Sequence, residues 1–210
     1  MRAVVRDPSL CQHHARLGRC EVLTGAVGGT RGGAGMIGGV QLRIRPARVD
    51  DVRRIRTLVE PLARDRILVS KDAVAYYEGL QQFLVAEAPE PAPRDGELVA
   101  CGALHVLWDD LAEVRTLATA PAYQGKGVGH QMLEALLDRA RELGVARVFC
   151  LTFEVAFFEA HGFEAIEGTP VEPDVYAQLL RSYDEGVAEF LDLDRVKPNT
   201  LGNTRMLRVL

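Results

Sequence analysis

Long hydrophobic runs are missing from this sequence of 210 residues. No segment approaches the roughly 18 consecutive apolar residues of a membrane-spanning helix, and the N-terminus lacks the apolar block of a secretory signal. We therefore predict a cytoplasmic protein without a membrane partner. The composition, with 48% hydrophobic and 26% charged residues, is typical of a globular protein with one substantial core.

Cysteines are few, and acidic residues outnumber basic ones. Two of the four cysteines, Cys101 and Cys150, lie in strand-like apolar runs, where a thiol usually acts as a small buried hydrophobe. The other two flank two histidines at a spacing that matches no standard zinc pattern (Cys11, His13, His14 and Cys20), so no metal is expected. A formal net charge of −4 argues against nucleic acid as a partner but permits a local basic pocket for an anionic cofactor.

Glycine is concentrated near the N-terminus. Nine of the 20 glycines fall within residues 1–40, which show little periodicity. We predict a disordered extension there, with Met36 as a candidate start of translation. Residues 41–210 are expected to form a single domain.

The apolar pattern from Leu42 onward predicts an α/β (α+β) fold with a central mixed, mostly antiparallel sheet flanked by helices. Strands are expected over 42–45, 83–87, 98–107, 112–119, 147–151 and 205–210. Helices are expected after an N-cap at Asp50, from Ser70 to Gly79, from Val128 to Gly144, over 155–161 and over 175–190. A turn at Asp95-Gly96 indicates an antiparallel meander, and the later helical crossover places strands 112–119 and 147–151 parallel.

Gly125, Gly127 and Gly129 lie between a predicted strand and a predicted helix. Their missing side chains let a ligand approach the backbone N–H groups, and the helix dipole adds to a site for phosphate. A tight turn without a ligand is the alternative. A dinucleotide-binding loop would follow a parallel strand, and an ATP-binding Walker loop would have Ser or Thr after Lys126, so neither class fits.

The pattern Gln124-x-x-Gly127-x-Gly129 resembles the signature of the GNAT superfamily of N-acetyltransferases, and the segment from Phe157 to Phe163 is similar to the family's later aromatic motif. The resemblance extends over about Leu42 to Phe163. It implies a GNAT-type fold and acetyl-CoA as the co-substrate. The implied cofactor-binding residues are Leu117, Ala118 and Thr119 for the pantetheine, Gln124, Gly125, Lys126, Gly127, Val128 and Gly129 for the pyrophosphate, and Phe157.

Acetyl transfer requires a neutral amine, a polarised thioester carbonyl and a proton for the departing thiolate. Glu113, on the strand that precedes the loop, is the candidate catalytic base; the alternative is an exposed strand residue without a role. A backbone N–H near Ala118 is the candidate carbonyl donor if a bulge frees it, as is common in the family. Phenylalanine replaces the family's usual proton donor, a tyrosine. The remaining candidate donors are Tyr123, Tyr176, Thr152 and water.

A narrower resemblance is to the acetyltransferase domain of N-acetylglutamate synthases, which acetylate the α-amine of glutamate to begin arginine synthesis. It rests on the stretches 68–71, 83–87, 100–104, 112–113 and 117–118. It implies a short stand-alone form that acts on L-glutamate or L-glutamine. Lys71, placed where the synthases have basic residues, and Arg115, on the strand face of Glu113, are the candidates for binding carboxylates. Glu154, where many synthases have Arg, favours a neutral or cationic end such as that of glutamine.

Two other functions are compatible with the sequence. The acetyl group would go to another amine if the acceptor were a protein N-terminus, a lysine, a polyamine or a drug, although Lys71 and Arg115 favour an anionic acceptor. A non-catalytic acyl-CoA sensor would also keep the phosphate loop. Residues 175–190 and the final strand are candidates for a homodimer contact.

Overall fold

The computed structural model describes residues 42–65, 67–68, 71–88, 97–196 and 202–210. The extension predicted over residues 1–40, the predicted turn at Asp95-Gly96 and the helix start expected at Ser70 lie outside these residues.

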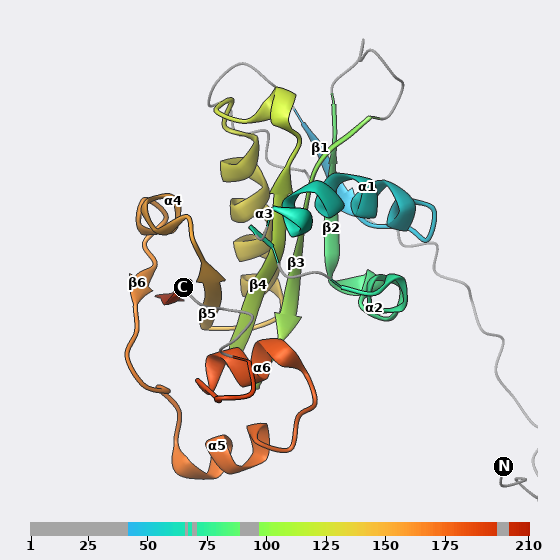
Figure 1. Cartoon of the computed structure of the whole chain (residues 1–210). Helices are drawn as coiled ribbons and strands as arrows, with labels where there is room; N and C mark the ends of the chain where they lie inside the picture. The colour runs from blue at the N-terminus through green and yellow to red at the C-terminus, as the bar shows by residue number, and fades with distance from the viewer. Residues whose placement is uncertain (1–41, 66, 69–70, 89–96, 197–201) are drawn as a thin grey trace, which may run out of the picture. The chain divides into compact units, whose positions relative to one another are not determined.

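Within the described residues, seven strands form one sheet in the order β1-β2-β3-β4-β5-β7-β6 (Figure 1). Their bounds are Arg43–Pro46 (β1), Phe83–Glu87 (β2), Leu98–Val106 (β3), Leu111–Thr119 (β4), Arg147–Thr152 (β5), Glu164–Ala165 (β6) and Thr204–Val209 (β7). All neighbours are antiparallel except β4 and β5, so the predicted mixed sheet is confirmed. The final strand pairs within its own chain, with β5 and β6, and the homodimer stays a prediction.

Helices cover both faces of the sheet. Their bounds are Asp51–Arg64 (α1), Ala73–Glu78 (α2), Val128–Glu142 (α3), Val155–Glu159 (α4), Pro173–Leu179 (α5) and Glu185–Phe190 (α6), with short 3-10 turns at Leu80–Gln82 (η1) and Pro121–Tyr123 (η2). Side chains alternate along β2, so Phe83 and Val85 pack in the α1 cluster whereas Leu84 and Ala86 pack in the α3 cluster. None of the described helices is long and apolar enough to cross a membrane.

The helical spacing of apolar residues from Val128 to Leu143 predicts one stripe, and α3 buries this stripe against the sheet up to Ala140. The buried members are Val128, Met132, Leu133, Leu136, Leu137 and Ala140, whereas Leu143 lies after the end of the helix and is 49% exposed. The helix ends at Glu142, and Gly144 follows with φ 79°, the left-handed conformation expected after a helix C-terminus. Periodicity and the terminal glycine therefore predicted this helix well.

Helix α1 begins directly after Asp50, as predicted, but the Asp50 side chain does not cap it. Asp50 has helical dihedral angles, and its side chain makes no capping hydrogen bond. The carboxylate of Asp51, the first residue of α1, instead accepts a hydrogen bond from the backbone N–H of Arg48, three residues before it, at 2.8 Å. Two further bonds, from Arg45 Nη1 at 2.6 Å and Nη2 at 3.0 Å, allow this carboxylate to be buried.

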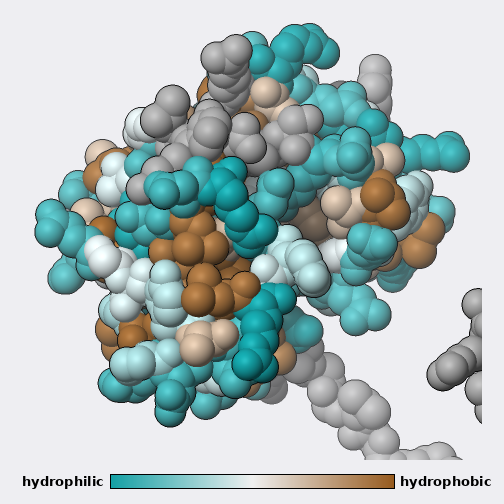
Figure 2. Space-filling model, turned by 60° about the horizontal axis from the view of Figure 1, so that its bottom comes forward, coloured by the Kyte–Doolittle hydropathy of each residue, from teal (hydrophilic) through white to brown (hydrophobic). Residues whose placement is uncertain are grey.

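The single helix predicted over 175–190 is wrong, because α5 and α6 are separate. Asp184 causes the interruption: it adopts an extended conformation and its Oδ1 accepts a hydrogen bond from the Val187 backbone N–H at 3.2 Å, as an N-cap does. The two helices lie beyond one end of the sheet in Figure 1. Figure 2 brings that end forward and shows apolar residues gathered in the middle of a largely hydrophilic face.

Candidate active site

The parallel strands β4 and β5 pair over a short distance only. Their register runs from Leu111 with Arg147 to Glu113 with Phe149. Beyond these pairs β4 continues to Thr119 along β3, while β5 continues along β7. The strands therefore part after Glu113, and the β5 side of β4 has backbone N–H and C=O groups without a strand partner in the described chain. An edge of this kind can pair with an extended ligand.

A β-bulge follows Arg115 on β4. Cys101 of β3 pairs with Ala118 and Ala103 pairs with Arg115, so β4 has one more residue than β3 between these pairs. Thr116 has φ 57°, which is uncommon for a residue other than glycine. The bulge that the sequence interpretation required near Ala118 is present. Such a bulge takes a backbone N–H out of the ladder and leaves it able to bind a ligand.

The glycine loop enters α3 through left-handed backbone conformations. Gly125 has φ 69°, and Gly127, the N-cap of α3, has φ 78°. Gly127 has no side chain to cap the helix, and the first N–H groups of any helix lack acceptors within it. These N–H groups and the helix dipole form a site that fits a phosphate group. Lys126 adds a positive charge, with Nζ 5.6 Å from the centre of the Tyr123 ring.

Residues distant in sequence meet at this loop. The Gln124 side chain donates a hydrogen bond to the Thr119 backbone oxygen at 3.4 Å, which ties the loop to the end of β4. A Cβ built on Gly129 would lie 3.6 Å from Thr119 Oγ1 and 3.7 Å from Phe157 Cε2, so both side chains pass close to the start of α3. The structure thus brings together the predicted cofactor residues of β4, the loop and α4 (Leu117, Ala118, Thr119, Gln124, Gly125, Lys126, Gly127, Val128, Gly129 and Phe157).

Glu113 is a buried carboxylate, not an exposed strand residue. Its relative exposure is 3%, and its Oε2 has no hydrogen-bond partner among the described residues. Burial raises the pKa of Glu113 to about 7, against the opposing effect of the positive charges of Arg115 and Lys71. A carboxyl group that titrates near neutral pH can both accept and release a proton there.

Arg115 links three elements around this carboxylate. Its Nη1 lies 3.6 Å from Glu113 Oε2 and donates to both Asp184 oxygens, at 3.1 and 3.2 Å. Its Nη2 donates to Gln82 Oε1 at 2.8 Å. Asp184 also lies 3.6 Å from His105 Nε2, and burial is the main cause that lowers the pKa of that histidine. Arg115 thus connects β4 with η1 and with the start of α6.

Lys71 and Glu189 complete what we call the charged cluster: Lys71, Glu113, Arg115, Asp184 and Glu189. Burial, followed by the charge of Arg115, lowers the pKa of Lys71, while the three acids oppose that shift. Burial and the nearby Glu113 raise the pKa of Glu189 to about 8. Among the described residues Lys71 makes no ion pair within 4 Å. The structure therefore brings together all three polar residues proposed from sequence, Lys71, Glu113 and Arg115.

Two acids of the cluster were missed from sequence. Asp184 directly precedes the short helix α6. Glu189 interrupts the apolar run Val187-Ala188-Phe190, and an acid within an apolar run is a weak sign of a buried functional group. Neither of these sequence features indicates that α6 packs on β4. Glu154 is exposed at the start of α4, where its backbone N–H donates to Thr152 Oγ1 at 2.9 Å.

Comparison with known proteins agrees with this geometry. Residues 49–163 match the model of the Acetyltransferase (GNAT) family. An amino-acid acetyltransferase of Mycobacterium tuberculosis is 54% identical over 167 residues, which cover 80% of this chain and 94% of that protein. A Mycobacterium tuberculosis structure in complex with CoA and the ligand NLQ has a TM-score of 0.75 at 54% identity, covering 80% of this chain and 99% of that one.

Longer relatives match over part of their length. An amino-acid acetyltransferase of Pseudomonas putida is 35% identical over 138 residues, which cover 64% of this chain but 31% of that protein. The chain therefore belongs to the acetyltransferase (GNAT) family, and it is an acetyl-CoA-dependent enzyme that acetylates an amino acid.

Proposed function

We propose that the enzyme transfers the acetyl group of acetyl-CoA to the α-amine of L-glutamate or L-glutamine, the step that begins arginine synthesis. The proposal rests chiefly on Glu113, whose buried carboxyl group has a pKa of about 7. This carboxyl group lies near Arg115 and Lys71, at the point where β4 and β5 cease to pair. The local similarity of five sequence stretches to N-acetylglutamate synthases supports the choice of acceptor.

Acetyl-CoA supplies the acetyl group as a thioester. The start of α3 and Lys126 hold the pyrophosphate, because this is where free N–H groups and positive charge coincide. The free edge of β4 over Leu117–Thr119 pairs with the pantetheine. Phe157, next to Gly129, packs against the cofactor beside the loop.

Glu113 removes the proton from the substrate ammonium, directly or through one water molecule. The N–H bond breaks, the proton passes to a Glu113 carboxylate oxygen, and the freed lone pair attacks the acetyl carbonyl carbon. As the tetrahedral intermediate collapses, its C–S bond breaks and the CoA thiolate takes up the second proton of the amine, so that CoA leaves as the thiol. A pKa of about 7 suits this role, because the base is ionised at slightly alkaline pH yet still takes a proton. The backbone N–H released by the bulge near Ala118 stabilises the negative charge that develops on the carbonyl oxygen.

The balance of charge in the cluster favours an acceptor with a carboxylate. Glu189 is neutral below a pH of about 8 because burial and Glu113 raise its pKa. Two cations, Lys71 and Arg115, then face Asp184 and a Glu113 that is partly protonated near pH 7. Arg115 is held by Asp184 and Gln82, which leaves Lys71 as the main cation for a substrate carboxylate.

The experiment is a product assay with several amines. The full chain is incubated with acetyl-CoA and with Glu, Gln, Asp, Arg, spermidine or a lysine peptide, and products are identified by mass spectrometry. We expect N-acetylglutamate or N-acetylglutamine to form fastest. A faster reaction with another amine would overturn the proposed acceptor. Acetyl-CoA binding without any acetylated product from glutamate or glutamine would likewise overturn the proposed acceptor.

A further inference from the structure

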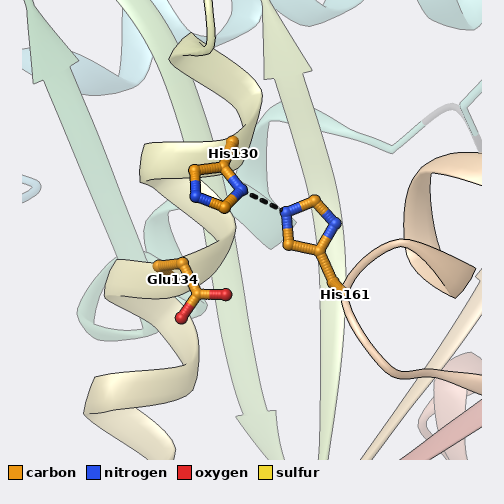
Figure 3. Close-up of side chains that lie close together, drawn as sticks. All are labelled: His130, Glu134 and His161. Atoms are coloured by element: carbon orange, nitrogen blue, oxygen red, sulfur yellow. Dashed lines mark hydrogen bonds between the residues drawn. The ribbon is translucent and has the colours of Figure 1, made fainter. Parts of the chain in front are cut away.

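Two histidines and a glutamate lie together between α3 and the end of α4, apart from the charged cluster (Figure 3). His130 and Glu134 are four residues apart on α3, so they share one face of the helix. His161 follows α4, and its Nε2 lies 2.6 Å from His130 Nδ1. One possible ligand atom from each residue lies within 4.8 Å of the other two, and all three residues are half-buried.

The backbone of α4 orients the His161 ring. Its Nδ1 lies 2.6 Å from the Phe157 backbone oxygen. A carbonyl oxygen can only accept, so Nδ1 carries the proton and donates it. In the neutral ring Nε2 then has a lone pair, which is directed at His130. Histidines that bind metals commonly have this arrangement, with a carbonyl holding one ring nitrogen while the other nitrogen binds the ion.

Two imidazoles and one carboxylate are ligands that suit divalent transition-metal ions. Zinc in particular binds three such protein ligands and leaves a fourth position for water. We propose that His130, Glu134 and His161 form a binding site for a divalent transition-metal ion, with Zn²⁺ as the first candidate. None of these three residues belongs to the charged cluster, so the metal site does not depend on which amine accepts the acetyl group.

The ion requires a small movement of the two rings. Nitrogens bound to one tetrahedral zinc at about 2.0–2.1 Å lie roughly 3.3 Å apart. The rings must therefore move apart from their hydrogen-bonded separation of 2.6 Å. Glu134 already has a partner, because Arg208 Nη1 lies 3.8 Å from its Oε1. Its other carboxylate oxygen can bind the ion while Arg208 stays at Oε1.

A bound ion would join α3 to α4 beside the phosphate loop. His130 lies in the first turn of α3, and the His161 ring centre is 4.6 Å from that of Phe157. Phe157 in turn lies close to Gly129. The ion would thus hold the α4 segment against the start of α3. Because it binds the folded state, it would also raise the melting temperature of the protein.

The test is a titration of the full chain with Zn²⁺ in competition with a chromophoric chelator, together with Tm measured with and without Zn²⁺. We expect one Zn²⁺ bound at this site and a rise in Tm. The variants His161→Gln and Glu134→Gln should each bind it at least about tenfold more weakly, since loss of groups that merely support a metal ligand already has that effect. The rise in Tm should disappear in both, and circular dichroism without Zn²⁺ verifies that they fold.

Two control variants separate this site from other metal ligands of the chain. The first replaces the cysteines and histidines near the N-terminus (Cys11→Ser, His13→Gln, His14→Gln and Cys20→Ser). The second is Glu142→Gln, at an exposed glutamate on the same helix. Both should keep the wild-type affinity of the site. Equal affinity in wild type and His161→Gln, or loss of Zn²⁺ in the first control variant alone, would overturn the proposal.

Discussion

Gly186 of α6 lies directly against the Glu113 carboxylate of β4. A Cβ built on Gly186 would come 2.7 Å from Glu113 Cδ and 3.0 Å from Asp184 Oδ1. The absence of a side chain therefore lets α6 cover the proposed base. The packing of α6 over the carboxylate contributes to the burial that raises the pKa of Glu113 to about 7.

Gly186→Ala should lower both stability and turnover. Alanine normally stabilises a helix relative to glycine, but here its Cβ has no room, and overpacking typically costs about 1–3 kcal/mol. A displacement of α6 by about 1 Å would reduce turnover roughly a hundredfold. Urea unfolding and thiol release measure the two effects. In a Glu113→Ala background the stability cost of Gly186→Ala should largely vanish, and an equal cost in both backgrounds would contradict the contact.

Gly127→Ala should weaken the binding of CoA. Gly127 has φ 78°, a conformation that costs about 1–2 kcal/mol for alanine, so the loop would leave the geometry that presents its N–H groups. A loss of about tenfold in affinity corresponds to 1.4 kcal/mol. Gly144→Ala is the matched control, since Gly144 has φ 79° at the other end of α3. Gly144→Ala should lose about as much stability as Gly127→Ala but bind CoA with the wild-type affinity. A similar loss of CoA affinity in both variants would argue against the loop site.

The pH dependence of kcat/KM should show the titration of Glu113. Its pKa is about 7 because the carboxyl group is buried, so below that pH it is protonated and cannot accept the proton of the amine. We expect kcat/KM to rise with pH through about 7. Glu189 interacts with Glu113, so the observed pKa values belong to the pair. A profile with no change between pH 6 and 8 would exclude Glu113 as the base.

Glu189→Gln should make stability less dependent on pH. The folded protein keeps the proton of Glu189 up to a pH of about 8, whereas the ordinary pKa is 4.5. The folded state thus binds the extra proton, and its stability declines as pH rises from about 4.5 to about 8. Removing this group should reduce the decline between pH 5 and 9 by roughly 4 kcal/mol, since each pKa unit corresponds to about 1.4 kcal/mol. Parallel pH curves for wild type and variant, measured by urea unfolding, would contradict the buried state of Glu189.

Much of the fold follows from the sequence because its helices and strands have distinct apolar patterns. The stripe of α3, from Val128 to Ala140, is periodic and bounded by glycines, and the strands of the meander are separated by turn signals. The same local pattern placed the phosphate loop. Asp50 shows the limit of local reasoning: the pattern predicts that α1 begins after this residue, but the buried hydrogen bonds are made by its neighbour Asp51, which Arg45 on another element stabilises.

The rest of the site depends on contacts between distant segments. Asp184 reaches Arg115 across 69 positions of sequence, and nothing in the local pattern of α6 indicates that it packs on β4. His130 and His161 likewise meet only because α3 and α4 lie side by side. Lys71, Glu113 and Arg115 were found because two lie on one strand face and the third falls in a stretch similar to the synthases.

In the proposed reaction, acetyl-CoA and glutamate or glutamine react with Glu113 as the base. The most direct measurement is thiol release from acetyl-CoA by wild type and Glu113→Gln, with each amino acid at pH 8, alongside the affinity of each protein for CoA. We expect rapid release by wild type and a fall of at least about a hundredfold in Glu113→Gln, which is within the range of general-base catalysis. The affinity for CoA should be the same in both proteins. Equal turnover by the two proteins would contradict the proposed reaction.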